Sequence, residues 1–160
     1  MTRIYLLSAL LGILPISELR GAIPYAYFNG VPLLSAAAIG VISNALVPFI
    51  AFVFFETLHR LLDRWPFYHR LFEKTVTRAR NKVSEKVNKY GLLGLMLFVA
   101  IPLPITGAWT GTVGAWVMGL DRKKSILFIL LGILISGTIV SSVIYTGAGI
   151  ASLFTKTVNI

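Results

Sequence analysis

The chain contains no cysteine, and its 160 residues include only six Asp and Glu against fifteen Lys and Arg. The absence of cysteine excludes disulfide bonds, thiolate metal sites and cysteine nucleophiles. Charged residues make up 13% of the chain, whereas a soluble globular domain has about a quarter. So few charges cannot cover a water-facing surface. With 56% hydrophobic residues, the composition predicts a single integral membrane domain over residues 1–160.

The scarcity of carboxylates also bears on catalysis. Glu18 is the one carboxylate expected at membrane depth, and no histidine accompanies it. A general acid–base pair or a metal cluster cannot be assembled there, and no glycine-rich phosphate-binding motif is present. We therefore expect no enzyme, no metal site and no cofactor. We assign the net charge of +9 to the cytoplasmic face of a membrane protein rather than to nucleic acid binding.

Four stretches without charged residues or histidine organise the chain: 4–17, 21–55, 91–120 and 125–155. A helix needs about 20 apolar residues to cross a hydrocarbon core. We expect transmembrane helices over 32–56 and 124–154. The segment between the two halves, 57–90, is densely charged, and its apolar residues recur at three- and four-residue steps. This pattern predicts an amphipathic basic helix lying in the membrane interface, with a solvated connector helix as the alternative.

The basic residues predict the topology. Nine of them lie between Arg60 and Lys89, and three more are Arg122, Lys123 and Lys124. If 91–120 crossed the membrane, the second group would lie outside, against the positive-inside rule. If 91–120 enters and returns as a re-entrant hairpin, all twelve are cytoplasmic. We therefore expect a multi-pass protein of the cell (inner) membrane, with both termini extracytoplasmic and the linker 57–90 cytoplasmic.

Proline-containing breaks lie near the middle of both hairpin segments. Pro102 and Pro104 prevent a continuous helix, because each removes a backbone donor and clashes with the preceding turn. In the first half, the segment 14–21 interrupts a second expected hairpin, 4–28. Each half then consists of a broken hairpin followed by a transmembrane helix, and we divide the chain into a first repeat, 1–56, and a second, 91–155. The expected fold is an all-α membrane protein built as an inverted repeat.

The first break supplies the strongest candidate site. Irregular backbone at membrane depth must be buried in protein or line a wet cavity, so we expect the two breaks to face inward, toward each other. Glu18 and Arg20 are two residues apart, and an ionisable residue at this depth indicates function by default. With Gly21 and Pro24 opening the returning helix, Arg20 and that helix terminus predict an anion-accepting site. The alternatives are a pair that only braces the loop, or side chains that reach the interface.

Uncharged groups complete the expected substrate or ion site. The second break contributes Pro102, Pro104, Thr106, Gly107 and Thr110. Threonine also caps helices, and Thr106 could serve only that purpose. Asn44 needs a partner for its buried amide, and packing between helices is its favoured role.

The run 17–24, Ser-Glu-Leu-Arg-Gly-Ala-Ile-Pro, resembles the hallmark of the putative small multidrug export protein family. The run 101–111 is similar to that family's second signature. The resemblance covers nearly the whole chain and extends to the DedA superfamily. It implies paired re-entrant hairpins and transport of polyprenyl-phosphate or other lipid carriers. DedA-type proteins usually carry an arginine and acidic residues in both inserted regions, whereas the second break here has none.

Together these observations predict a secondary transporter or exporter of unknown substrate, with proton coupling through Glu18 left open. Two alternatives remain. One is a flippase or scramblase for anionic lipids of the polyprenyl-phosphate type, and the other is a membrane protein with a structural or assembly role and no transport. The expected partners are membrane lipids and a small-molecule or lipid substrate. A homodimer is a further alternative, because one hairpin unit buries little surface by itself.

Overall fold

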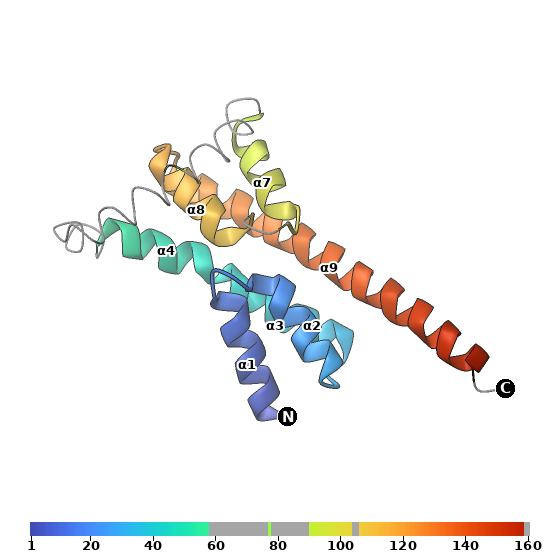
Figure 1. Cartoon of the computed structure of the whole chain (residues 1–160). Helices are drawn as coiled ribbons and strands as arrows, with labels where there is room; N and C mark the ends of the chain where they lie inside the picture. Colours follow the sequence, from blue (N-terminus) through green and yellow to red (C-terminus); the bar gives the residue numbers. More distant parts are fainter. Residues whose placement is uncertain (58–76, 78–89, 104–105, 159–160) are drawn as a thin grey trace.

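The computed structural model describes residues 1–57, 77, 90–103 and 106–158, with side chains described as far as Gly147. Throughout these ranges all regular secondary structure is helical, as expected (Figure 1). Most of the expected interfacial helix over 57–90 lies outside the described residues. In chain order the helices are α1 (Thr2–Ile13), α2 (Glu18–Phe28), α3 (Leu33–Ala45), α4 (Val47–Glu56), α7 (Leu92–Ala100), α8 (Ala108–Val117) and α9 (Arg122–Val158).

In the first half, α1 and α2 pack against each other and against α3. Glycines permit this close approach. A Cβ on Gly40 would lie 2.5 Å from Cγ1 of Ile23, and one on Gly12 would lie 2.9 Å from Cβ of Ser43. The Asn44 side chain, which is 1% exposed, donates a hydrogen bond of 2.9 Å to the Gly12 carbonyl. The amide thus joins α3 to the end of α1, as the packing role predicts.

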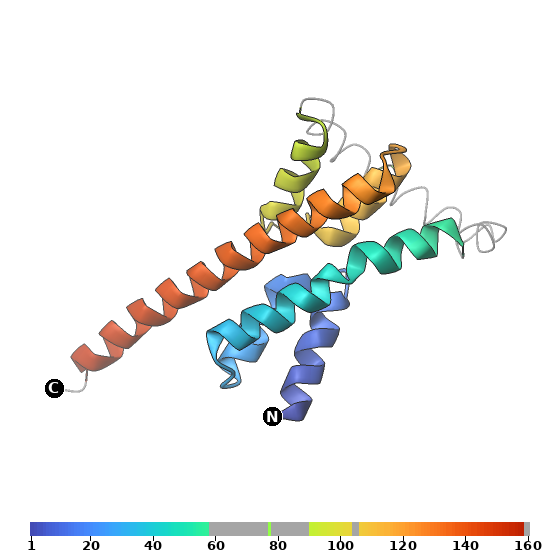
Figure 2. The same cartoon turned by 180° about the vertical axis from the view of Figure 1, so that it is seen from behind.

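The helix expected over 32–56 is interrupted at Leu46, which separates α3 from α4. Pro48 explains the interruption, because it has no N–H to donate to the carbonyl four residues earlier. The two helices still follow one another as one bent rod (Figure 2). Leu33–Glu56 therefore keeps the length of a membrane span, at 24 residues.

In the second half, α7 packs along α9. Gly132 on α9 allows the contact, since a Cβ there would lie 2.7 Å from the Met96 carbonyl oxygen and 2.8 Å from Cβ of Val99. Asp121 caps α9 by accepting a hydrogen bond of 2.8 Å from the Lys124 N–H. The returning helix α8 lies against α9 and, across the molecule, against α4.

Contacts between helices of the two halves join them. Among the described residues, α3 packs on α9, α4 on α8, α2 on α9, and α4 on α9. The rings of Phe55 and Trp116 stack with centroids 5.2 Å apart, which fixes α4 against α8. Glu56 and Arg122 form an ion pair of 2.6 Å, so the end of α4 lies beside the start of α9. Helices α3 and α4 therefore run antiparallel to α9.

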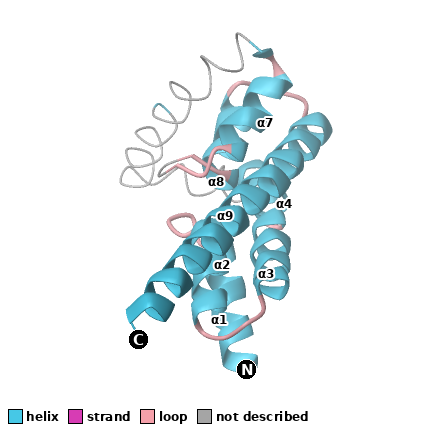
Figure 3. Cartoon of the chain, turned by 90° about the vertical axis from the view of Figure 1, so that its right-hand side faces the viewer, coloured by secondary structure: helices cyan, strands magenta, loops and turns pink. Residues whose placement is uncertain are grey.

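In the described part of the chain, two helical segments are long and apolar enough to cross a membrane: Leu33–Glu56 and Arg122–Gly147. In the second, only 28% of the most apolar window is buried inside the protein. A helix in the core of a soluble protein would be mostly buried, so this exposed apolar surface favours contact with lipid. Figure 3 shows that the start of α1 and the end of α9 lie at one end of the molecule, opposite the start of α7.

Candidate functional site

The first break occupies the four residues 14–17 between α1 and α2. Its apolar side chains are exposed, with Ile16 at 92%. The returning helix begins at Glu18, earlier than expected, and Pro24 lies inside it rather than at its start. Glu18 has a φ of 50°, a conformation that non-glycine residues seldom adopt. This turn carries the Glu18 side chain into the protein, where the residue is 3% exposed.

The second break runs from Ile101 to Gly107, and residues 104 and 105 in it are outside the described part. The Thr106 hydroxyl holds the turn together. It lies 2.7 Å from the Ile101 carbonyl oxygen and 2.9 Å from that of Leu103, and it accepts the Leu103 N–H at 3.2 Å. The Thr106 hydroxyl thus fastens the loop, and its place in a substrate site stays a prediction.

Glu18 connects the first break to the second. One carboxylate oxygen accepts the Trp109 N–H at 3.2 Å, and the other accepts the Ala108 N–H at 3.4 Å. These donors are the first free N–H groups of α8, where the helix dipole favours negative charge. Gly107 precedes them with a φ of 142°, and its missing side chain leaves room for the carboxylate. Glu18 therefore caps a helix 90 residues away in the sequence.

Arg20 makes a second connection between the breaks. A guanidinium nitrogen donates to the Leu103 carbonyl, and another lies 3.9 Å from Glu18 Oε2. The indole N–H of Trp109 adds a third connection, donating to the Ile13 carbonyl at 2.7 Å. We call Glu18, Arg20, Leu103, Ala108 and Trp109 the clasp. Two charged residues at the start of α2 thus bind the uncharged second break and the start of α8.

The structure brings together several of the predicted site residues. Glu18 and Arg20 pair as their spacing suggested, and Gly107 and Thr106 lie in the loop that they hold. Gly21 lies beside Ser17, because a Cβ on it would overlap the Ser17 hydroxyl. Thr110 is half-buried on α8.

Three predicted residues, Asn44, Pro102 and Pro104, are not part of the clasp as defined above. Asn44 binds Gly12 rather than the clasp. Pro102 is half-buried in the second break, and Pro104 is outside the described residues. The helix terminus that binds a carboxylate in the structure is that of α8, and the carboxylate is the chain's own Glu18. An anion site formed by Arg20 and the start of α2 stays a prediction. Trp109 was not among the predicted site residues, although a half-buried indole N–H needs an acceptor and could have signalled its role.

A comparison with known protein families matches residues 18–139 to the family described as putative small multi-drug export protein. The match begins at Glu18, directly after the first break, and covers the second break and most of both long helical segments. The chain belongs to this family. Neither curated proteins nor solved structures give a match. The family's name and the two long apolar segments indicate a membrane protein of export rather than an enzyme.

Proposed function

We propose that the chain is a secondary transporter in which the clasp between two re-entrant breaks controls the transport pathway. The observation that carries the proposal is the Glu18 carboxylate, buried and bound to the N-terminus of α8. Burying a charge is costly, so a bare loop brace would be served better by neutral groups. A carboxylate in this place can also take up a proton.

The proposed topology places both hairpins in the membrane as inverted repeats. Three features support it. The α1–α2 pair packs on α3 as the α7–α8 pair packs on α9, and the returning helix of each half also contacts the long helix of the other half. The start of α1 and the end of α9 lie at the same end of the molecule. We place this end outside the cell, and the linker 57–90 in the cytoplasm.

The clasp gives the transporter two states. In the closed state, the anion-accepting site formed by Arg20 and the α8 N-terminus is occupied by the Glu18 carboxylate. When Glu18 binds a proton, its negative charge is lost, and the attraction to Arg20 and to the helix dipole falls. The breaks can then separate, which opens a path between them. Movement of the proton is in this way linked to movement of the substrate.

The experiment is substrate-dependent proton movement in proteoliposomes. A panel of drug-like amphiphiles is added from outside, and trapped pyranine reports the internal pH. Glu18→Gln keeps the size of the side chain but cannot bind or release a proton, so we expect the proton signal to fall to that of protein-free liposomes. Glu56→Gln, at an exposed ion pair outside the clasp, is the matched control and keeps the signal. A wild-type signal in Glu18→Gln would overturn the proposal.

A second candidate function is the transfer of anionic lipids, and the surface beside the clasp favours it. Leu103, whose carbonyl binds Arg20, is 54% exposed, and Ile16 in the other break is more exposed still. Apolar side chains next to a guanidinium suit a lipid with a phosphate head group and apolar tails. In the same liposomes, competition by a short-chain polyprenyl phosphate would distinguish this function from export of drug-like compounds.

A further inference from the structure

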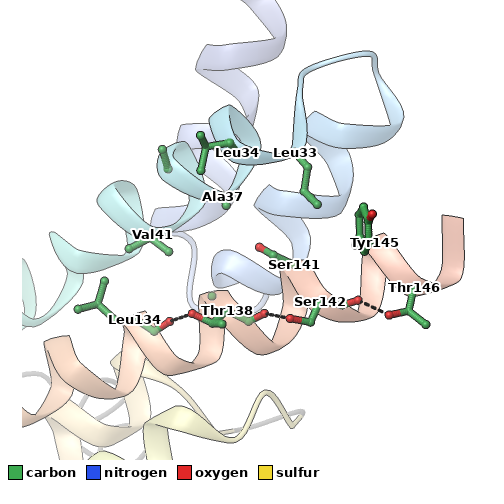
Figure 4. Close-up of a pocket in the computed structure, with 12 residues that line it drawn as sticks. Leu33, Leu34, Ala37, Val41, Leu134, Thr138, Ser141, Ser142, Tyr145 and Thr146 are labelled. Carbon is green, nitrogen blue, oxygen red and sulfur yellow. Dashed lines mark hydrogen bonds between the residues drawn. The ribbon is translucent and has the colours of Figure 1, made fainter. Parts of the chain in front are cut away.

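A groove of about 680 Å³ lies between α3 and α9, and none of the residues that line it takes part in the clasp (Figure 4). Near one end of the groove, where Leu134 lines it, Gly137 of α9 lies against Val41 of α3, since a Cβ on Gly137 would lie 2.5 Å from Cγ2 of Val41. From there it extends to the start of α3 and to Thr146 on α9. These parts of both helices lie at the end opposite the Glu56–Arg122 ion pair.

The two walls of the groove differ in chemistry. The α3 wall is apolar and includes Leu33, Ala37 and Val41, whereas the α9 wall carries a row of hydroxyl groups (Figure 4). Among the described residues that line it there is no Asp, Glu, Lys, Arg or His. A charged group entering this part of the membrane would lose its hydration without gaining a counter-charge. The groove therefore favours an uncharged occupant.

The hydroxyl row is arranged to bind polar atoms without charge. Thr138, Ser142 and Thr146 each donate to the carbonyl four residues earlier, at 2.8 to 2.9 Å, which leaves their oxygen lone pairs free to accept. Ser141 differs, because its hydroxyl oxygen is buried without a hydrogen-bond partner among the described residues. An acceptor on the occupant could receive the Ser141 proton.

We infer that this groove binds uncharged amphiphilic molecules, with the apolar body on α3 and a hydroxyl, ether or carbonyl group on α9. The inference rests on the proposed function and names its substrate class. The groove is then the part of the pathway on the proposed extracytoplasmic side, where α3 begins and α9 ends.

Photolabelling in nanodiscs of neutral lipid tests the inference. The probe is an uncharged benzophenone alkanol, compared with its carboxylate and trimethylammonium analogues of equal chain length, and labelled peptides are mapped by mass spectrometry. We expect the alkanol to label 134–146 more than about tenfold above either analogue, the ratio that corresponds to 1.4 kcal/mol. Equal labelling by all three probes, or preference for a charged one, would overturn the inference.

Two variants show whether the groove itself is labelled. Thr138→Trp fills it, whereas Ile139→Trp places the same ring on an exposed position of α9 outside it. Labelling should fall to background in the first and persist in the second. If Thr138→Trp does not elute as a single species, Ser142→Phe replaces it. Labelling that survives the filling substitution means that the probe binds the lipid-facing surface, and the inference is wrong.

The same labelling in Glu18→Gln separates this inference from the proposed function. Because Glu18 does not line the groove, the alkanol should label this variant as it labels the wild type. If the alkanol shows no selective labelling while proton movement still depends on Glu18, only the groove inference is wrong. Proton movement that does not depend on Glu18 would overturn the proposed function, whatever the groove binds.

Discussion

Gly107→Ala is expected to open the clasp. A Cβ at this position would overlap Glu18 Oε2 and lie 2.6 Å from Cδ of the carboxyl group, and the φ of 142° does not suit alanine. The side chain of Glu18 must then leave the α8 N-terminus. Losing charge-assisted hydrogen bonds and adding backbone strain should together lower the free energy of unfolding by about 3 kcal/mol. Substrate-dependent proton movement should be lost as well.

The control for Gly107→Ala is Gly91→Ala. Gly91 also has a positive φ, of 59°, but a Cβ there meets nothing within 4 Å. Gly91→Ala should lower the free energy of unfolding by about 1 kcal/mol, from backbone strain alone, and leave proton movement intact. A double-mutant cycle isolates the contact itself: in a Glu18→Ala background, where the carboxylate is gone, Gly107→Ala should cost no more than Gly91→Ala. If Gly107→Ala still lowers the free energy of unfolding by about 3 kcal/mol in that background, the contact with Glu18 is not the cause, and the clasp is contradicted.

Arg20→Ala is the second large change. The guanidinium holds the Leu103 carbonyl of the second break and lies beside the buried Glu18 carboxylate. Without Arg20, the Glu18 carboxylate still accepts hydrogen bonds from the N-terminus of α8 but loses its counter-charge. Because Arg20 is 20% exposed and water can replace part of the interaction, we expect a loss of about 2 kcal/mol of stability rather than the larger cost of a fully buried pair. Chemical unfolding in detergent measures this loss.

Arg20→Ala should reduce substrate-dependent proton movement by more than the loss of folding stability alone would cause. Arg20→Lys separates the two, since lysine keeps the charge near Glu18 but not the planar fork that reaches both partners. We expect it to restore most of the stability and only part of the proton movement. If Arg20→Ala lowers stability while proton movement remains normal, the pair is a structural brace and the transport proposal loses one of its two charged groups.

The sequence predicts the helices well, because their ends depend on local chemistry. The prolines of both breaks separate α1 from α2 and α7 from α8 near the expected places. The sequence pattern predicts the start of a helix less well where a turn competes with the helix. Glu18 adopts a positive φ, so that α2 begins there and not at Gly21.

The clasp itself could be predicted only in part. Two charges spaced by two residues near a break indicate a pair, and the structure brings Glu18 and Arg20 together. Their partners, Leu103, Ala108 and Trp109, contribute mainly backbone atoms, which no residue type reveals. The groove between α3 and α9 depends on how two distant helices pack, and no local pattern marks it. The membrane topology and the linker 57–90 stay predictions.

The topology is the central claim, and the absence of cysteine allows a direct measurement. Single cysteines replace Asn88 in the linker, the exposed Asp121 before α9, and the exposed Asn29 between α2 and α3, and intact cells are treated with a membrane-impermeant maleimide. If α7 and α8 enter the membrane and turn back, Asn88→Cys and Asp121→Cys are both protected until the membrane is permeabilised, whereas Asn29→Cys is labelled from outside. If Asn88→Cys and Asp121→Cys are labelled from opposite sides, the segment 91–120 crosses the membrane. The re-entrant hairpin and the inverted repeat would then be wrong.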